Sequence, residues 1–429
     1  MTLRECAHLE VREQPCAGGV RREACLSIDG REQRYAWHYD IWGRSGPLGA
    51  LDGMIHSCLF LAMRMGLPLR VHGAVTETAL YNLAEFTRAW SHWRPDLYHA
   101  FDILPEQVIA PTSRVPTRAI AAFSGGVDGT FTLLHNRSRL AAGGHDIQSA
   151  LLIHGFDVDY ENELSFNRLI ERLRPNLESL GAELQIIRTN SKHLPQDWED
   201  SFGAQLAGCL HQYSDRYGTA LIASSEPYSA LILPLGSNPL TDRLLSGGLM
   251  QIVHDGAQFS RTEKVVHLAK HPALIDRLKV CWEGAVQHEN CGTCEKCTRT
   301  RLNFLAAGVS SPGCFDSPFD AATIDRLRIR NAFQLAELKN LLAYAEDHDV
   351  AAEWVARLRR RLSWLDLRCR GLRLLDALHL RAPVRRLARH ADRLLRRNRL
   401  PPDWRQATVP PPVSPRSAVP VANAPISLP

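Results

Sequence analysis

Long apolar runs are missing from this sequence of 429 residues, and their absence limits what the chain can be. No apolar stretch is long enough to cross a bilayer as a helix. The N-terminal residues, MTLRECAHLEVREQPC, are polar and charged, so they lack the apolar centre of a secretory signal peptide. With 45% hydrophobic and 23% charged residues, the composition is that of a soluble globular protein. We therefore predict a cytoplasmic protein without a membrane span.

Repeats are also absent, and the cysteines are mostly scattered. The chain has 11 cysteines, an odd number, and in a reducing cytosol scattered cysteines are usually small buried hydrophobes. Four of them instead lie close together in the sequence. The net charge of +5 comes largely from the last quarter of the chain, so it says little about the chemistry of the middle.

The length of the chain exceeds what one hydrophobic core usually supports, so we expect two or three domains. Residues 1–112 predict an N-terminal α+β module, and a polar, proline-bearing linker follows. Residues 113–310 alternate short apolar runs with helical segments, which is typical of a parallel sheet covered on both faces. Residues 311–400 predict a basic helical region, and residues 401–429 a disordered proline-rich tail.

A glycine turn, SGGVDGT, follows the first apolar run of the middle region and precedes a helix. Glycines allow a sharp turn and a close approach to a ligand, and the helix directs its free N–H groups back at the turn. Such a turn binds phosphate, with hydroxyl donors from Ser124 and Thr130. Asp128 fits if it holds Mg²⁺ or caps the helix, and a plain strand-to-helix turn is the alternative. The turn is neither a Walker A loop nor a Gly-x-Gly-x-x-Gly dinucleotide motif.

Four cysteines lie close together in VCWEGAVQHENCGTCEKC, namely Cys281, Cys291, Cys294 and Cys297. Four thiolates are the full tetrahedral set for a structural zinc ion, and N–H groups of the knuckle can soften the charge on sulfur. An iron–sulfur cluster and a redox pair are weaker alternatives. Because four thiolates close the coordination shell, we expect the zinc to hold the fold rather than to react.

The glycine turn resembles the pyrophosphate loop of the PP-loop superfamily of N-type ATP pyrophosphatases. Together with the cysteine knuckle it is similar to the 7-cyano-7-deazaguanine synthase family, over roughly residues 119–308. The resemblance implies a five-stranded parallel, HUP-like (adenine nucleotide alpha hydrolase-like) sheet with helices on both faces. It also implies that ATP places its β- and γ-phosphates in the loop and is cleaved to AMP and pyrophosphate. One residue departs from the family pattern, because Gly129 stands where a Ser or Thr is usual.

The resemblance also implies site residues. Asp128, Arg261 and Lys264 are the catalytic candidates, since RTEKVVHLAK is similar to a phosphate-contacting element of the family. The implied contacts to ATP are Ser124, Gly125, Gly126, Val127, Asp128, Gly129, Thr130 and His154.

Other polar residues at the ends of the predicted strands each allow two interpretations. Asp157, like His154, either contacts ribose or substrate or lies in a solvated loop. Ser224, Ser225 and Glu226 begin a long segment that carries either substrate contacts or turn chemistry. His254 and Asp255 either contact substrate or close a turn, Asn190 is expected to cap a helix, and Cys209 to be buried on one.

We therefore predict an AMP-forming enzyme that uses ATP, Mg²⁺ and a structural Zn²⁺ to adenylate a carboxylate for attack by ammonia or an amine. The substrate would be a small-molecule carboxylate or a nucleobase-like molecule. A PP-loop enzyme acting on RNA and a non-catalytic nucleotide-binding subunit are the alternatives. The arginine-rich helices predict a helical cap with a solvated basic face, and RNA, an acidic protein and a second copy of the chain in a homodimer are the partners to consider.

Overall fold

The computed structural model of the chain describes residues 5–43, 45–110 and 116–377, with the surroundings of side chains described up to residue 367. Most of the predicted linker, the end of the predicted basic region and the whole predicted tail lie outside the described residues. Within the described residues, no helix combines the length and the apolar character needed to cross a membrane.

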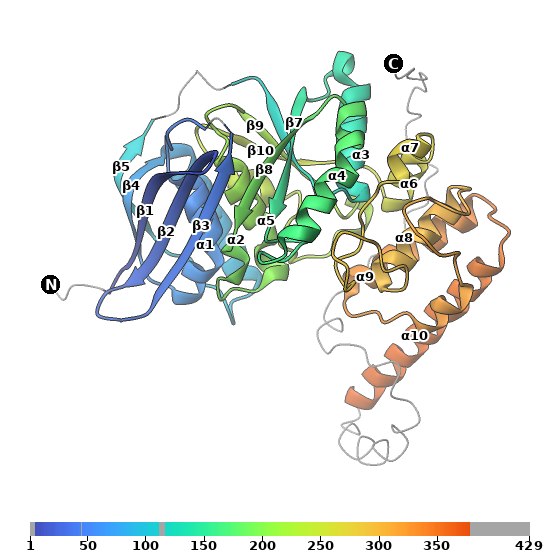
Figure 1. Cartoon of the computed structure of the whole chain (residues 1–429). Coiled ribbons are helices and arrows are strands. Elements are labelled where there is room, and N and C mark those ends of the chain that lie inside the picture. The colour runs from blue at the N-terminus through green and yellow to red at the C-terminus, as the bar shows by residue number, and fades with distance from the viewer. Residues whose placement is uncertain (1–4, 44, 111–115, 378–429) are drawn as a thin grey trace.

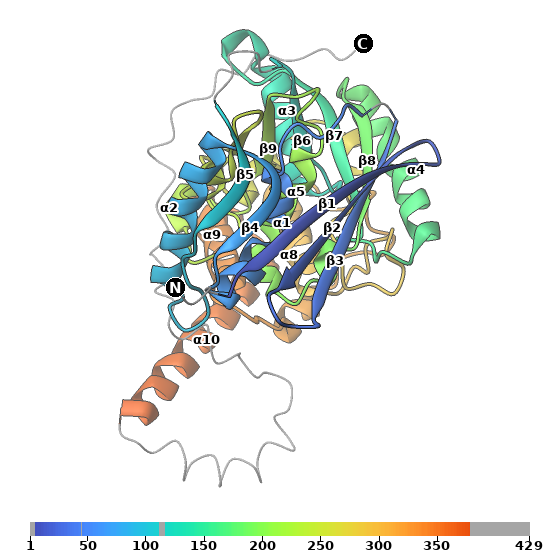
Figure 2. The same ribbon diagram turned by 90° about the vertical axis from the view of Figure 1, so that its left-hand side faces the viewer.

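One ten-stranded mixed sheet runs through the molecule (Figures 1 and 2). Its strands are β1 (Ala7–Cys16), β2 (Gly19–Ile28), β3 (Arg34–Trp42), β4 (Leu69–Thr76), β5 (Ile103–Ile109), β6 (Ala119–Ala122), β7 (Ile147–His154), β8 (Glu183–Thr189), β9 (Thr219–Ala223) and β10 (Gln251–Asp255). Their order is β10-β9-β6-β7-β8-β3-β2-β1-β4-β5. The predicted α/β class is confirmed, but the sheet has ten strands instead of five, because β3 pairs with β8 and joins the N-terminal strands to the others.

Helices cover both faces of the parallel part of this sheet (Figure 1). The helices in the described part of the chain are α1 (Asp52–Met65), α2 (Glu77–Trp93), α3 (Val127–Ser138), α4 (Glu163–Ser179), α5 (Trp198–His211), α6 (Arg261–Leu268), α7 (Pro272–Ile275), α8 (Glu295–Ala306), α9 (Ala332–Asp347) and α10 (Glu353–Ala377). Short 3-10 turns are η1 (Leu140–Ala142), η2 (Ser191–His193), η3 (Tyr228–Ala230), η4 (Asp242–Leu245) and η5 (Ala321–Arg326). Helices α1, α2 and α5 pack on one face, and α3, α4, α6 and α8 contribute to the core on the other.

The five strands β6 to β10 are parallel, and apolar side chains pack on both of their faces. Along β6, Ile120 packs in the core beneath α5, whereas Ala119 and Ala121 pack in the core beneath α3 and α4. Because successive side chains point to opposite faces, a strand covered on both sides must be apolar throughout. This burial explains the continuous apolar runs of the middle region.

The strands β1 to β3 form an antiparallel meander with one covered face. Ala24 and Leu26 of β2 and Trp37 of β3 point into the core, while Glu23 points outward and is exposed. Alternation of this kind is typical of an antiparallel sheet with a solvated side. Strand β5 forms the edge of the sheet, and it contains Pro105, which cannot donate to a further strand.

A third core joins the C-terminal helices to the rest of the chain. It gathers apolar side chains of α8, η5, α9 and α10 around Leu338, Leu341 and Leu358, which are fully buried. Two arginines of α10 form ion pairs with neighbouring elements, because Arg357 contacts Asp325 and Arg359 contacts Glu346. The described part of the predicted basic helical region is therefore helical and packs on the body.

Candidate functional site

A cavity of about 460 Å³ lies where the parallel strands end. Strand β6 has β7 on one side and β9 on the other, so the chain order reverses at this strand. In parallel sheets such a reversal leaves a crevice at the carboxyl ends of the strands, and ligands bind there. The cavity wall contains Ala122 at the end of β6, Ile153 in β7 and Ala223 at the end of β9.

The glycine turn forms the floor of this cavity between β6 and α3. Gly125 has a φ of +78°, and a Cβ at this position would collide with Leu173 of α4, so only glycine fits. Gly126 is the N-cap of α3, and no side chain caps the helix. The alternative of an aspartate N-cap is therefore wrong, and the first amides of α3 are open to an anion in the cavity.

Asp128 lies in the first turn of α3 and joins two cations of α6. Its Oδ2 atom is 2.5 Å from Nη1 of Arg261, and its Oδ1 atom is 3.4 Å from Nζ of Lys264. Burial alone would raise the pKa of Asp128, but the charges of Arg261 and Lys264 outweigh burial and lower it. The three predicted catalytic residues thus lie together, with Lys264 fully buried and also donating to the carbonyl oxygen of Ser224.

Two more cations reach the cavity from α8, and the sequence analysis did not identify them. Lys296 lines the wall, and burial, together with the charge of Arg261, lowers its pKa to about 8. Arg299 is buried between Glu295 at 2.7 Å and Glu337 at 2.8 Å. Burial opposes the charge of Arg299, but these carboxylates outweigh it and raise its pKa. The position of Lys296 between two cysteines of the knuckle was the available signal.

Apolar and aromatic side chains also line the cavity. Trp198, Phe202 and Leu206 of α5 line it, and α9 adds Phe333 from its first turn. Lys192 lies over the ring of Trp198 at 4.7 Å and donates to a backbone carbonyl. Because the wall of this cavity contains both cationic and aromatic residues, it suits a ligand that has both an anionic group and a flat apolar group.

Four predicted site residues lie outside the cavity wall: Gly125, Thr130, His154 and Lys264. Thr130 is fully buried, and its hydroxyl has no hydrogen-bond partner in the described part of the chain. His154 stacks on Phe166 at 4.3 Å and contacts the carbonyl oxygen of Asp159, and burial lowers its pKa. Of the remaining predicted ATP contacts, Ser124, Gly126, Val127, Asp128 and Gly129 all line the cavity, as does Arg261.

Gly129, the departure from the family pattern, has a local reason. A Cβ at this position would lie 3.3 Å from the ring of Phe123, which is buried at the end of β6. Contacts this short force a neighbour to move, so the glycine makes room for the phenylalanine. A residue larger than glycine at position 129 would therefore crowd the side chain of Phe123.

Of the other polar candidates at the strand ends, some line the cavity and others contact neighbouring elements instead. Asp157 and Ser225 line the cavity. His254 instead contacts Asp242 at 2.8 Å, and Asp255 accepts a bond from Thr132. These contacts join the end of β10 to η4 and to α3, so both side chains have structural partners away from the cavity wall.

Three further candidates, Asn190, Glu226 and Cys209, lie outside the cavity wall and contact other parts of the chain. Asn190 does not cap η2 with its side chain, but accepts a hydrogen bond from the amide of His38 in β3. Glu226 accepts a bond from the amide of Ile232, and burial raises its pKa to about 8. Cys209 is buried on α5, as predicted.

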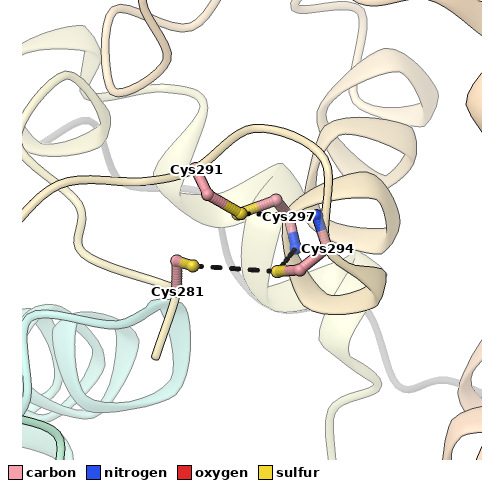
Figure 3. A group of neighbouring side chains, drawn as sticks. All are labelled: Cys281, Cys291, Cys294 and Cys297. Carbon is pink, nitrogen blue, oxygen red and sulfur yellow. Dashed lines mark hydrogen bonds between the residues drawn. The ribbon is translucent and has the colours of Figure 1, made fainter. Parts of the chain in front are cut away.

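The four cysteines form a compact group beside the cavity (Figure 3). Their sulfur atoms, from Cys281, Cys291, Cys294 and Cys297, all lie within 4.8 Å of one another. The Cys281–Cys294 and Cys291–Cys297 pairs are separated by 3.7 and 3.8 Å. A zinc ion with bonds of about 2.3 Å to four sulfurs requires separations of about 3.8 Å, so the group could hold Zn²⁺.

Backbone amides support this group from within the knuckle. The amide of Cys294 lies 3.4 Å from the sulfur of Cys291, and the amide of Cys297 lies 3.4 Å from the sulfur of Cys294. Cys294 is also the N-cap of α8, so the helix begins at a ligand. With zinc bound, N–H donors in these positions would reduce the negative charge on the thiolates.

None of the comparisons with known proteins found a match. No family model, no curated protein and no solved structure corresponds to this chain. The resemblance to the PP-loop superfamily therefore remains an expectation from the sequence, and the functional argument depends on the cavity and its residues.

Proposed function

We propose that the chain binds ATP with Mg²⁺ in this cavity, cleaves it between the α- and β-phosphates and adenylates a carboxylate. The observation that carries the proposal is the position of the glycine turn at the reversal point of a parallel sheet, where open helix amides and cations line the same cavity. We infer from the same topology that β6 to β10 form a HUP-like unit within the larger sheet.

The residues that line the cavity provide contacts for both ends of ATP, the phosphates and the adenine. The amides of Val127 and Asp128, with Arg261 and Lys296, would receive the phosphates, and the aromatic wall around Phe202 would receive the adenine. Mg²⁺ would enter with ATP and neutralise charge on its phosphates. Asp128 and Asp157 line the cavity and supply the carboxylate oxygens that this ion prefers.

The residues of the chain would act mainly by positioning and by electrostatic stabilisation. A carboxylate oxygen of the substrate attacks the α-phosphorus, the bond to the bridging oxygen breaks, and pyrophosphate leaves with the electron pair. The amides of α3 and the cations Arg261 and Lys296 stabilise the charge that moves onto pyrophosphate. Ammonia or an amine then attacks the acyl carbon and releases AMP.

Exchange of labelled pyrophosphate into ATP across a library of carboxylates tests this proposal. We expect exchange with one class of acid, and a loss of at least about 100-fold in Arg261→Ala, because removing one preorganised donor typically costs this much. Arg243→Ala is the matched control, since Arg243 is exposed and lies outside the cavity wall.

Two results would contradict the proposal. Binding of ATP without exchange and without release of AMP would indicate a non-catalytic nucleotide-binding subunit. Salt-sensitive RNA binding combined with RNA-dependent release of AMP would favour the RNA-modifying alternative.

A further inference from the structure

The metal-binding cysteines and the cavity share the same short segments of chain. Cys281 and Cys291 stand at the two ends of the segment 282–290. This segment supplies Trp282 and Gln287 to the cavity wall. A metal ion on both cysteines would therefore fix the two ends of a segment that forms part of the ligand site.

The first turn of α8 has the same double role. Cys294 caps this helix and Cys297 lies in its first turn, while Lys296 and Arg299 alternate with them and line the cavity. The ammonium of Lys296 lies 4.0 Å from the centre of the Trp282 ring. The segment 282–290 and α8 are thus in contact on the side that faces the cavity.

Hydrogen bonds connect these segments to the rest of the cavity rim. Gln287 donates to a carboxylate oxygen of Asp159 at 2.6 Å and accepts from the Asn162 side chain at 3.0 Å, which joins it to the connection between β7 and α4. On the other side of the cysteines, the amide of Lys279 donates to the carbonyl oxygen of Gly125 at 2.8 Å. The residue two positions before Cys281 therefore contacts the glycine turn directly.

We propose that zinc on the four cysteines regulates ligand binding, because it holds the segment 282–290 and the first turn of α8 in the arrangement that completes the cavity. This inference rests on the proposed function for the identity of the ligand, ATP. Zinc and ATP then bind cooperatively, and thermodynamic linkage makes the effect reciprocal: ATP tightens the binding of zinc by the same factor by which zinc tightens the binding of ATP.

Release of zinc from the full-length, zinc-loaded chain tests the coupling without measuring catalysis. Zinc transferred to the chromogenic chelator 4-(2-pyridylazo)resorcinol is followed by absorbance, with and without ATP and Mg²⁺ at a concentration that calorimetry shows to be saturating. We expect ATP to raise the affinity of the chain for zinc by about 5- to 150-fold, the usual range for coupled sites, and therefore to slow the release.

Variants separate this coupling from a general gain in stability. The double variant Trp282→Ala, Gln287→Ala keeps all four cysteines but removes the contacts between the metal-bound segment and the cavity, so ATP at saturation should protect its zinc much less. Gln287→Glu, which places a carboxylate against Asp159, gives a second test if the double variant does not fold. Trp42→Ala is the matched control, because Trp42 is similarly exposed and lies outside the cavity wall, and it should behave like the original chain.

The outcomes distinguish the inference from the function on which it rests. If ATP binds but does not change the release of zinc, or if it protects the double variant as strongly as the original chain, the inference is overturned. If calorimetry detects no binding of ATP to the zinc-loaded chain, the proposed function itself fails.

Discussion

The two halves of the sheet differ in what their strands leave at the ends. Strands β6 to β10 are parallel and covered on both faces, and their carboxyl ends open on a cavity. The meander β1 to β3 is antiparallel and has one solvated face, and none of its residues lines that cavity. The comparison teaches that this chain places its candidate chemistry where a parallel sheet reverses its order, and uses the meander to extend the sheet.

Removing a metal ligand should produce the largest difference in hydrogen exchange between the two halves. In Cys297→Ser a buried ligand is lost, and we expect zinc affinity to fall by more than about 100-fold, since even changes outside the ligand shell cost 10–100-fold. Hydrogen exchange should then increase in α8 and in the segment 282–290, and stay unchanged in β1 to β3. Cys25→Ser, on the solvated face of β2, is the control, and equal loss of protection in both halves would contradict the comparison.

The two halves can also be compared at single turns, by measuring how much unfolding free energy is lost when a glycine with positive φ is replaced by alanine. Gly125→Ala adds backbone strain and a collision with Leu173, so we expect a loss of about 2–5 kcal/mol in unfolding free energy together with loss of ATP binding. Gly30→Ala adds strain alone, because nothing lies within 4 Å of its Cβ, and should cost about 1–2 kcal/mol. Denaturant titration and calorimetry measure both effects, and similar losses would indicate that the glycine turn is not crowded.

Acid sensitivity should depend more on Asp128 than on a carboxylate of the meander. The pKa of Asp128 is lowered in the folded chain, so its contribution to stability is present above its unfolded pKa of about 4 and is lost as the pH falls through the folded value. Asp128→Asn should therefore flatten the fall in unfolding free energy below about pH 4. Asp29→Asn should have a smaller effect, although the hydrogen bond from the Cys6 amide lowers the pKa of Asp29, because solvent screens this exposed group.

The smallest effect is expected at Gly129. Gly129→Ser introduces a Cβ 3.3 Å from Phe123, so we expect a loss of about 1 kcal/mol or less after a small shift of the ring. Phe123→Leu combined with Gly129→Ser should restore the stability. If the single variant gains stability, the glycine has no packing role, and thermal unfolding of the three variants decides the question.

Local patterns in the sequence were sufficient to predict many elements. The amphipathic spacing of ETALYNLAEFTRAWSHW is typical of a helix and matches α2 with identical bounds, and the alternation of RYAWHYDIW is typical of a strand and matches β3. Strand β5 is harder to predict, because Pro105 argues against a strand although the edge of a sheet tolerates it. The joining of the two halves could not be predicted, because it depends on a short pairing between Tyr39–Ile41 of β3 and residues far along the chain.

The candidate site likewise contains residues that local sequence patterns predict and residues that only the packing of helices brings in. The glycine turn and the cysteine group are local in sequence, so both could be identified from spacing. Arg299 and Phe333 could not, because only the packing of α8 and α9 brings them to the cavity. Thr130 and His154 were expected at the ligand because they follow strands closely, but each side chain turns into a core.

Helix α8 belongs to two cores at once, since Phe304 packs beneath the sheet and Leu302 packs among the C-terminal helices. Deleting the chain after about residue 350 would consequently expose the apolar side of α9 and disturb the helix that carries Lys296. A truncated protein that no longer bound RNA would say nothing about which arginines touch it. Charge reversal at an exposed position of α10, such as Arg360→Glu, leaves that shared helix intact. It therefore tests directly whether that arginine contacts RNA.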